Sequence, residues 1–167
     1  MRRAGFSLVE ILVVLTIMGT ILAIGTLQFN LFMTKGTIER QTRELYADFM
    51  AARTAAVTQH TSKTVVITPT SVTFVSADLG GGTTTKTLAK PITWAGKASG
   101  DAQKVIIFDE QGAFDVVNNG NTTICVKPTL EKAQVDSIVL FSTRIHLGKV
   151  YFDGIQGDCT SDNVTVK

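Results

Sequence analysis

The chain has few of the residues from which catalytic groups and metal sites are usually built. Among its 167 residues are two His and two Cys. His60 and His146 show no spacing to a nucleophile, an acid or a cysteine that would form a catalytic group or a zinc site. We expect His60 to have a structural role near the end of a helix and His146 to lie on the exposed side of a strand. The sequence therefore predicts no enzyme, no cofactor and no bound metal.

Net charge is also nearly absent. Lys and Arg number 16 and Asp and Glu number 14, and without Arg2 and Arg3 the two signs balance. A near-neutral chain gives little support to a nucleic-acid or acidic-surface partner. The basic positions that could face DNA phosphates have no aromatic residues interleaved with them; they are Lys127, Lys132, Arg144, Lys149 and Lys167. DNA binding is kept only as an alternative.

No stretch of the sequence is a good match to a phosphate-binding or calcium-binding motif. Residues Gly80–Thr87 read GGGTTTKT, but Thr85 stands where a phosphate loop has a second Gly, and no helical pattern follows. A hairpin tip is the better interpretation. The paired or clustered acids are Asp109 with Glu110, Asp153 with Asp158, and Asp162. They fall at predicted turns or lack calcium-loop spacing, so we expect solvated turn residues.

One long apolar run dominates the N-terminal part. Residues Phe6–Leu27 read FSLVEILVVLTIMGTILAIGTL, apolar on every face with a single charge at Glu10. As a helix rising about 1.5 Å per residue, the run would be roughly 33 Å long. That length is enough to cross a hydrocarbon layer of about 30 Å, so we expect lipid or other subunits to cover it. Arg2 and Arg3 before the run predict a cytoplasmic N-terminus and an exported C-terminal domain.

Glu10 is the anomaly of this run. A mid-membrane acid costs about 2.5–3.5 kcal/mol, so such residues lie near an interface, are neutralised or have a partner. One interpretation is a carboxylate tolerated close to the membrane surface. The other is that Glu10 pairs with a cation from another chain. A free amino group on Phe6, created by cleavage after Gly5, would suit.

The string RAGFSLVEILVV at residues 3–14 resembles the type III signal of type IV pilins and pseudopilins. Gly5, Phe6 and Glu10 match that signal position by position. The resemblance implies that prepilin peptidase cuts between Gly5 and Phe6 and methylates the new amino terminus. It further implies that Glu10 neutralises the terminus of a neighbouring subunit. The implied partners are other pilin or pseudopilin subunits, the peptidase, an inner-membrane assembly platform, and membrane lipid before assembly.

An ordinary secretory signal peptide is the alternative for this segment. Its cleavage site would be Ala23-Ile24-Gly25. Glu10 would interrupt its apolar core, and the helical pattern does not stop at Gly25.

Beyond Leu27 the helix is expected to continue as an amphipathic half. Its apolar stripe consists of Leu31, Ile38, Leu45, Phe49, Ala52 and Ala56, spaced by sevens and fours. Glu39 and Arg43 are four residues apart and could form a weak ion pair. Gly36 is a soft point of about 1 kcal/mol relative to Ala, and the alternative is a separate helix after a break there.

From Thr64 onward the pattern changes to short strands with frequent turns. The predicted strands are Thr64–Thr68, Val72–Ser76, Thr83–Leu88, Ile92–Trp94, Lys104–Phe108, Phe114–Val117, Thr122–Lys127, Ile138–Ser142 and Ile145–Asp153. Pro69-Thr70-Ser71 is the turn of a hairpin, and Asn118–Asn121 is the strongest turn signal. We therefore expect an α+β fold, in which a long N-terminal helix packs on an antiparallel β-sheet domain.

A second resemblance narrows the family. Residues 105–112, VIIFDEQG, are similar to the F-x-x-x-G segment of the GspH/FimT group of pseudopilins and minor pilins. The stretch Ser137–Val150 resembles that group's closing segment, although Thr143 stands where the group often has Gly. The resemblance implies a leader at 1–5, a transmembrane and assembly helix at 6–29, an amphipathic half at 30–62 and a periplasmic head at 63–167.

Cys125 and Cys159 form an even pair, which in an exported domain predicts one disulfide. A metal pair or two free thiols are the alternatives. The disulfide would close a loop of about 35 residues and contribute roughly 4 kcal/mol in the chain-entropy account.

Together these features predict a minor subunit of a type II secretion or type IV pilus filament. Its head would lie in the periplasm and then in the filament. The alternatives are a major pilin, a DNA-binding minor pilin, and an enzyme tethered by a plain membrane anchor.

Overall fold

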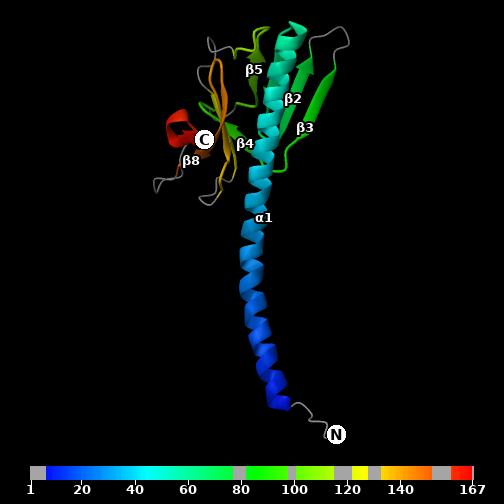
Figure 1. Cartoon of the computed structure of the whole chain (residues 1–167), viewed down its shortest axis with the longest axis vertical. Coiled ribbons are helices and arrows are strands. Elements are labelled where there is room, and N and C mark those ends of the chain that lie inside the picture. Colours follow the sequence, from blue (N-terminus) through cyan, green and yellow to red (C-terminus); the bar gives the residue numbers. More distant parts are fainter. Residues whose placement is uncertain are drawn as a thin grey trace. The chain divides into compact units, whose positions relative to one another are not determined.

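The structure is a computed structural model that describes residues 7–76, 82–97, 101–114, 122–127, 133–151 and 159–166. The side chains of Ile24, 26–28 and Ser76 fall outside this description. The chain divides into two compact units, Met1–Thr34 and Lys35–Lys167. We call the second unit the head. The described part contains one long α-helix followed by strands in two antiparallel sheets (Figure 1), which confirms the predicted α+β class.

Helix α1 covers Leu8–Gln59 as one element. It passes Gly36 without interruption, so the predicted alternative of a separate helix is not observed. At its end His60 takes a left-handed backbone conformation, with φ of 49°. The N–H of Thr61 then donates to the carbonyl of Ala56 at 3.2 Å, a pattern that closes helix ends. His60 thus has the predicted structural role at the helix end.

Within the head, α1 buries one stripe of apolar residues. Ile38, Leu45, Phe49 and Ala56 are buried and belong to the main core. The predicted stripe was wrong at its start, because Leu31 is 56% exposed and belongs to the first unit. The amphipathic half therefore begins later than the heptad spacing indicates.

The first sheet packs one face against α1. Its order is β3-β2-β1-β5, with β1 at Lys63–Ile67, β2 at Ser71–Ser76, β3 at Thr83–Thr87 and β5 at Lys104–Phe108. Burial alternates along β1, as expected for a sheet with one covered face. Phe74 of β2 meets Phe49 of α1 edge to face, with ring centroids 6.4 Å apart. Phe74 therefore lies on the face of the first sheet that α1 covers.

The second sheet has the order β4-β6-β7-β8-β9. Its strands are β4 at Ile92–Trp94, β6 at Thr122–Val126, β7 at Ser137–Leu140, β8 at Ile145–Val150 and β9 at Val164–Val166. Every residue of β6 and β7 is buried, because both faces of this sheet are covered. One face joins the main core, and the other forms a small second core that includes Val139, Val150 and Val164.

The observed strands agree with most of the predicted ranges to within a few residues. The sequence patterns missed β9, which has three residues after the short 3-10 helix Ser161–Asn163. Phe114 makes an isolated bridge to Phe108, whereas the rest of that predicted strand and the Asn118–Asn121 turn lie outside the described residues. The strands of the head therefore form two antiparallel sheets.

Candidate functional site

The first unit exposes a long series of large apolar side chains. They are Leu8, Val9, Ile11, Leu12, Val13, Val14, Leu15, Ile17, Met18, Ile21, Leu22, Phe29, Leu31, Phe32 and Met33. We call the described part of residues 8–33 the apolar stem. Contiguous apolar surfaces of this kind mark sites of contact with other proteins or with lipid. The stem is therefore the candidate functional surface of the chain.

Two described hydroxyl groups of the stem find partners within the helix itself. Thr16 Oγ1 donates to the carbonyl of Val13, and Thr20 Oγ1 donates to the carbonyl of Ile17, each at 2.8 Å. A buried hydroxyl without a partner would cost several kcal/mol in a fully apolar medium. Because these two groups are already paired, Thr16 and Thr20 can enter an apolar environment without that cost.

Glu10 is the only charged side chain between Ser7 and Thr34. It lies in the first turn of α1, where a negative charge interacts favourably with the helix dipole. Its side chain is exposed, and it forms no ion pair with any residue of the described ranges. The predicted cleavage residues Gly5 and Phe6 lie outside those ranges. Glu10 is thus the charged group of the stem that needs a partner from elsewhere.

Membrane crossing was the other prediction for this segment. In the part of the chain that the structure describes, no helix is long and apolar enough to cross a membrane. Of the predicted span Phe6–Leu27, Phe6 and the side chains of Ile24, Thr26 and Leu27 lie outside that description.

The F-x-x-x-G segment fixes a turn against the end of α1. Gly112 has a φ of +74°, and its carbonyl accepts a hydrogen bond from Arg53 Nε at 2.8 Å. A Cβ at this position would lie 2.7 Å from Cγ2 of Val57. Phe108, the first residue of the segment, is buried in the main core. The motif therefore has a packing role in the head.

Asp109 occupies the predicted turn and has a structural function there. Its Oδ1 accepts the backbone N–H groups of Gln111 and Ala113 at 2.9 and 2.7 Å. A carboxylate engaged in this way holds the turn in shape, and it agrees with the prediction of a turn acid.

Two side chains of α1 bind the backbone of distant loops. Gln41 donates to the carbonyl of Lys90 and accepts from the N–H of Lys90, at 2.7 and 2.8 Å. Glu39 Oε1 accepts the N–H of Gln134 at 2.7 Å. The ion-pair partner of Glu39 is Lys35, at 3.7 Å, so the predicted pair with Arg43 was wrong. The carboxylate is turned toward the loop that it binds.

A cluster of ion pairs connects β3 to α1. Lys86 Nζ lies 2.7 Å from Asp48 Oδ2 and 3.6 Å from Glu44 Oε2, and Arg40 pairs with Glu44 at 3.4 Å. The hydrogen bond to Asp48 is the main reason why the pKa of Lys86 is raised. Two positive and two negative groups are thus matched at the side of the head.

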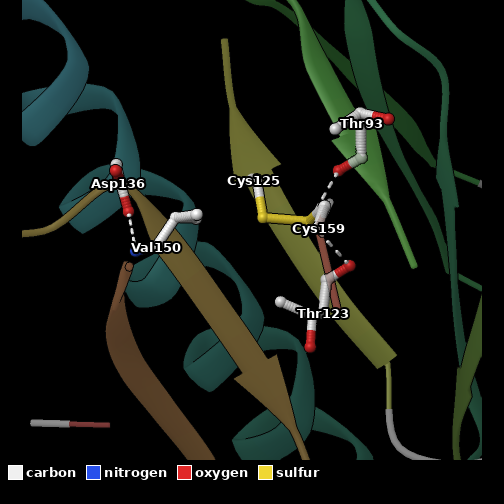
Figure 2. The surroundings of a disulfide bond; sticks show 6 residues. All are labelled: Thr93, Thr123, Cys125, Asp136, Val150 and Cys159. Carbon is white, nitrogen blue, oxygen red and sulfur yellow. Dashed lines mark hydrogen bonds between the residues drawn. A yellow bond between two sulfur atoms is a disulfide. The ribbon is translucent and has the colours of Figure 1, made fainter. Parts of the chain in front are cut away.

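The predicted disulfide is present in the structure. Cys125 of β6 and Cys159, 34 positions later, are bonded and buried. Figure 2 shows Cys159 beside the paired strands β4 and β6, with its Sγ 3.5 Å from the Thr123 carbonyl and 3.8 Å from the Thr93 carbonyl. These are close contacts, because a disulfide sulfur carries no hydrogen to donate. The bond attaches the segment that leads to β9.

Asp136 is a buried acid that the sequence patterns did not identify. Its side chain is fully buried, and Oδ1 accepts the N–H of Val150 at 2.8 Å (Figure 2). Oδ2 has no hydrogen-bond partner among the described residues. Burial raises the pKa of this carboxyl, while the Val150 hydrogen bond and the charges of Lys149 and Lys127 act in the opposite direction. Through its hydrogen bond to the last residue of β8, this carboxyl is a structural element of the head.

The remaining candidates do not form a site. His146 is half-buried with its ring 5.8 Å from that of Phe141, which corrects the expectation of a simply exposed side chain. Gly80 and Gly81 lie outside the described residues, and Thr83–Thr87 is strand β3 instead of a phosphate loop. Among the described residues no three His, Cys, Asp or Glu side chains group as metal ligands. Lys132, Asp153, Asp158 and Lys167 lie outside those residues.

Two family models match the chain. The model described as the prokaryotic N-terminal methylation motif matches residues 1–26, a range that contains Gly5, Phe6 and Glu10. The model described as type II transport protein GspH matches residues 41–142, from the second half of α1 to the end of β7. No curated protein and no solved structure matches the chain.

Proposed function

Because the chain belongs to the family of type II transport protein GspH and carries the N-terminal methylation motif, it is a type IV pilin-like subunit, and we propose that it is a minor pseudopilin or minor pilin. In this proposal prepilin peptidase processes the chain, and α1 inserts it into a type II secretion or type IV pilus filament. The observation that carries the proposal is the apolar stem, with paired hydroxyls and one unpaired carboxylate.

Processing would convert the N-terminus into the partner that Glu10 lacks. Cleavage between Gly5 and Phe6 creates a positively charged amino group at the start of the stem, which the same peptidase would methylate. The match to the methylation motif over residues 1–26 supports this step. The amino group of one subunit would then pair with Glu10 of its neighbour.

In this proposal the stem would form the contact surface between subunits, and Glu10 would determine their axial register. Burial of apolar surface contributes about 25 cal/mol per Å² relative to water, but membrane lipid already covers such a surface before assembly. Moving from lipid to a filament therefore changes this contribution little. A mismatched stack would leave the Glu10 carboxylate buried without a partner, which is strongly unfavourable. The pairing of charges would thus select one axial position.

The proposed topology follows from the same features. Residues 6–29 would anchor the precursor in the inner membrane, after a cytoplasmic leader at 1–5, and 30–62 would lead to a periplasmic head at 63–167. The buried disulfide supports a head outside the cytoplasm, since such bonds persist in oxidising compartments. No catalytic step is proposed, because the two matching family models describe a methylation motif and a transport protein.

The test replaces Glu10 in the full-length chain. We expect Glu10→Leu to leave membrane insertion intact and to reduce the amount recovered in sheared or purified filaments by at least about tenfold, the equivalent of 1.4 kcal/mol. Glu110→Leu, at an exposed turn, is the control for loss of a surface acid. Incorporation of Glu10→Leu at the level of the control would overturn the proposed pairing.

A further inference from the structure

Strand β3 is covered less than any other strand of the first sheet. It pairs with β2 on one side, and no described strand pairs with its other side (Figure 1). All of its residues except Lys86 are exposed. Lys86 is turned toward Asp48 and Glu44 of α1, and no described strand covers the outer edge. An edge of this kind is a template for another strand.

The backbone groups that point to this outer edge can be assigned. The N–H of Leu88 donates to the carbonyl of Thr70, and the register places Thr87 opposite Ser71. Because backbone groups alternate in direction along an antiparallel strand, those of Thr84 and Lys86 are turned toward β2. The N–H and C=O groups of Thr83, Thr85 and Thr87 point away from the sheet.

The usual protections of an edge strand are missing from β3. Such edges are guarded by proline, by a bulge, by shortness or by an outward lysine. Strand β3 has five residues, no proline and an unbroken register, and its lysine is held by Asp48 and Glu44. By contrast, the edges β4 and β9 have three residues each, and Phe114 bridges to the end of β5.

We propose that the outer edge of β3 binds an extended, uncharged segment of a different polypeptide as an additional strand. The main-chain groups of Thr83, Thr85 and Thr87 would provide the hydrogen bonds. Lys86 of β3 and the nearby Arg40 of α1, both among the described residues, are matched by Asp48 and Glu44, which favours an uncharged incoming strand. Uncharged β-branched side chains fit beside the threonines, as Thr73 and Thr85 already show with hydroxyl oxygens 3.0 Å apart.

Pairing of β3 with β3 of a second copy fits this edge poorly. Antiparallel pairing of β3 with β3 has a two-fold axis perpendicular to the sheet, which reverses every direction in the plane of the sheet. The two α1 helices, which pack along the sheets, would then run in opposite directions. That arrangement conflicts with a shared membrane orientation, and in this respect the choice of occupant rests on the proposed function.

The experiment uses the full-length chain in detergent micelles and a capped Thr-Val-Thr-Val-Thr peptide as the probe. The same peptide with proline at its central position is the control for partition into detergent. We expect the first peptide to shift the amide resonances of Thr83, Thr85 and Thr87, and the proline peptide to bind at least about tenfold more weakly, because a lost hydrogen bond leaves an unpaired group.

Two substitutions at Thr85 distinguish peptide binding through the backbone from peptide binding through the side chain. Thr85→Pro removes an outward N–H that β2 does not use, a position where edge strands tolerate proline. We expect it to weaken peptide binding at least about tenfold while the head stays folded, and Thr85→Val to keep the affinity within about twofold. Equal binding by Thr85→Pro and wild type, loss of binding in Thr85→Val, or absence of any shift would overturn the proposal. Glu10→Leu should bind the peptide normally, so failure of filament assembly is distinguishable from failure at β3.

Discussion

The apolar stem and the head use the same kinds of side chain in opposite ways. In the stem, Leu, Ile, Val and Phe side chains are exposed on every described turn of α1. In the head, the same helix buries a single stripe that includes Leu45 and Phe49 under two sheets. An apolar residue therefore stabilises the head through contacts within the chain, whereas an apolar residue of the stem is available for contacts with other molecules.

The largest expected effect is a difference in stability between an alanine substitution in the head and one in the stem of the same helix. Phe49→Ala removes a fully buried ring that meets Phe74 and should reduce the free energy of unfolding of the head by about 3–5 kcal/mol. Leu12→Ala, in the stem, should change it by no more than about 0.5 kcal/mol. The fluorescence of Trp94, the single tryptophan, reports head unfolding in urea. Equal effects of the two variants would contradict the division of roles.

A second, smaller effect concerns the turn that packs on the end of α1. Gly112 and Gly96 have similar positive φ angles, of 74° and 72°, but a Cβ meets other atoms only at Gly112. Gly96→Ala should therefore show the backbone cost alone, about 1–2 kcal/mol. Gly112→Ala should cost about 1–3 kcal/mol more, because its methyl overlaps Val57. If chemical denaturation gives the same loss for both, the contact with α1 is not what fixes this glycine.

Much of this division could be predicted from the sequence. The apolar run, the helical stripe and most of the strands follow from periodicity, and the disulfide follows from an even pair of cysteines in an exported domain. The start of the buried stripe could not be predicted, since Leu31 satisfies the heptad spacing as well as Ile38 does. What differs is that Ile38 is buried in the main core of the head, which is a tertiary property.

Polar partners were harder to predict than apolar ones. Glu39 could pair with Lys35 or Arg43 by spacing alone, and the loop amide of Gln134 that orients it is 95 positions away. Asp136 resembles any loop acid in the sequence, and only the covering of β7 and β8 makes it buried. The three residues of β9 are too few for a periodic signal. Each of these features depends on chain segments that meet only in the folded head.

The smallest expected effect is a pH dependence of the head that the stem does not share. Because burial raises the pKa of Asp136 above its ordinary value of 3.8, the unfolded chain ionises this group before the folded head does. The contribution of the protonated Asp136 to the free energy of unfolding is fully present below the ordinary pKa. It is lost as the pH rises through the raised pKa of the folded head. Asp136→Asn keeps an oxygen for the Val150 N–H but cannot ionise, so its urea midpoint should lack this fall. Parallel pH profiles for the variant and wild type would rule out Asp136 as the source.

The most direct test of the account is the mass of the N-terminal peptide of the mature protein, purified from its native membranes or filaments. The account predicts a chain that begins with methylated Phe6, which provides the cation that Glu10 requires. A mature chain that retains Met1, or that begins beyond Gly25, would contradict it.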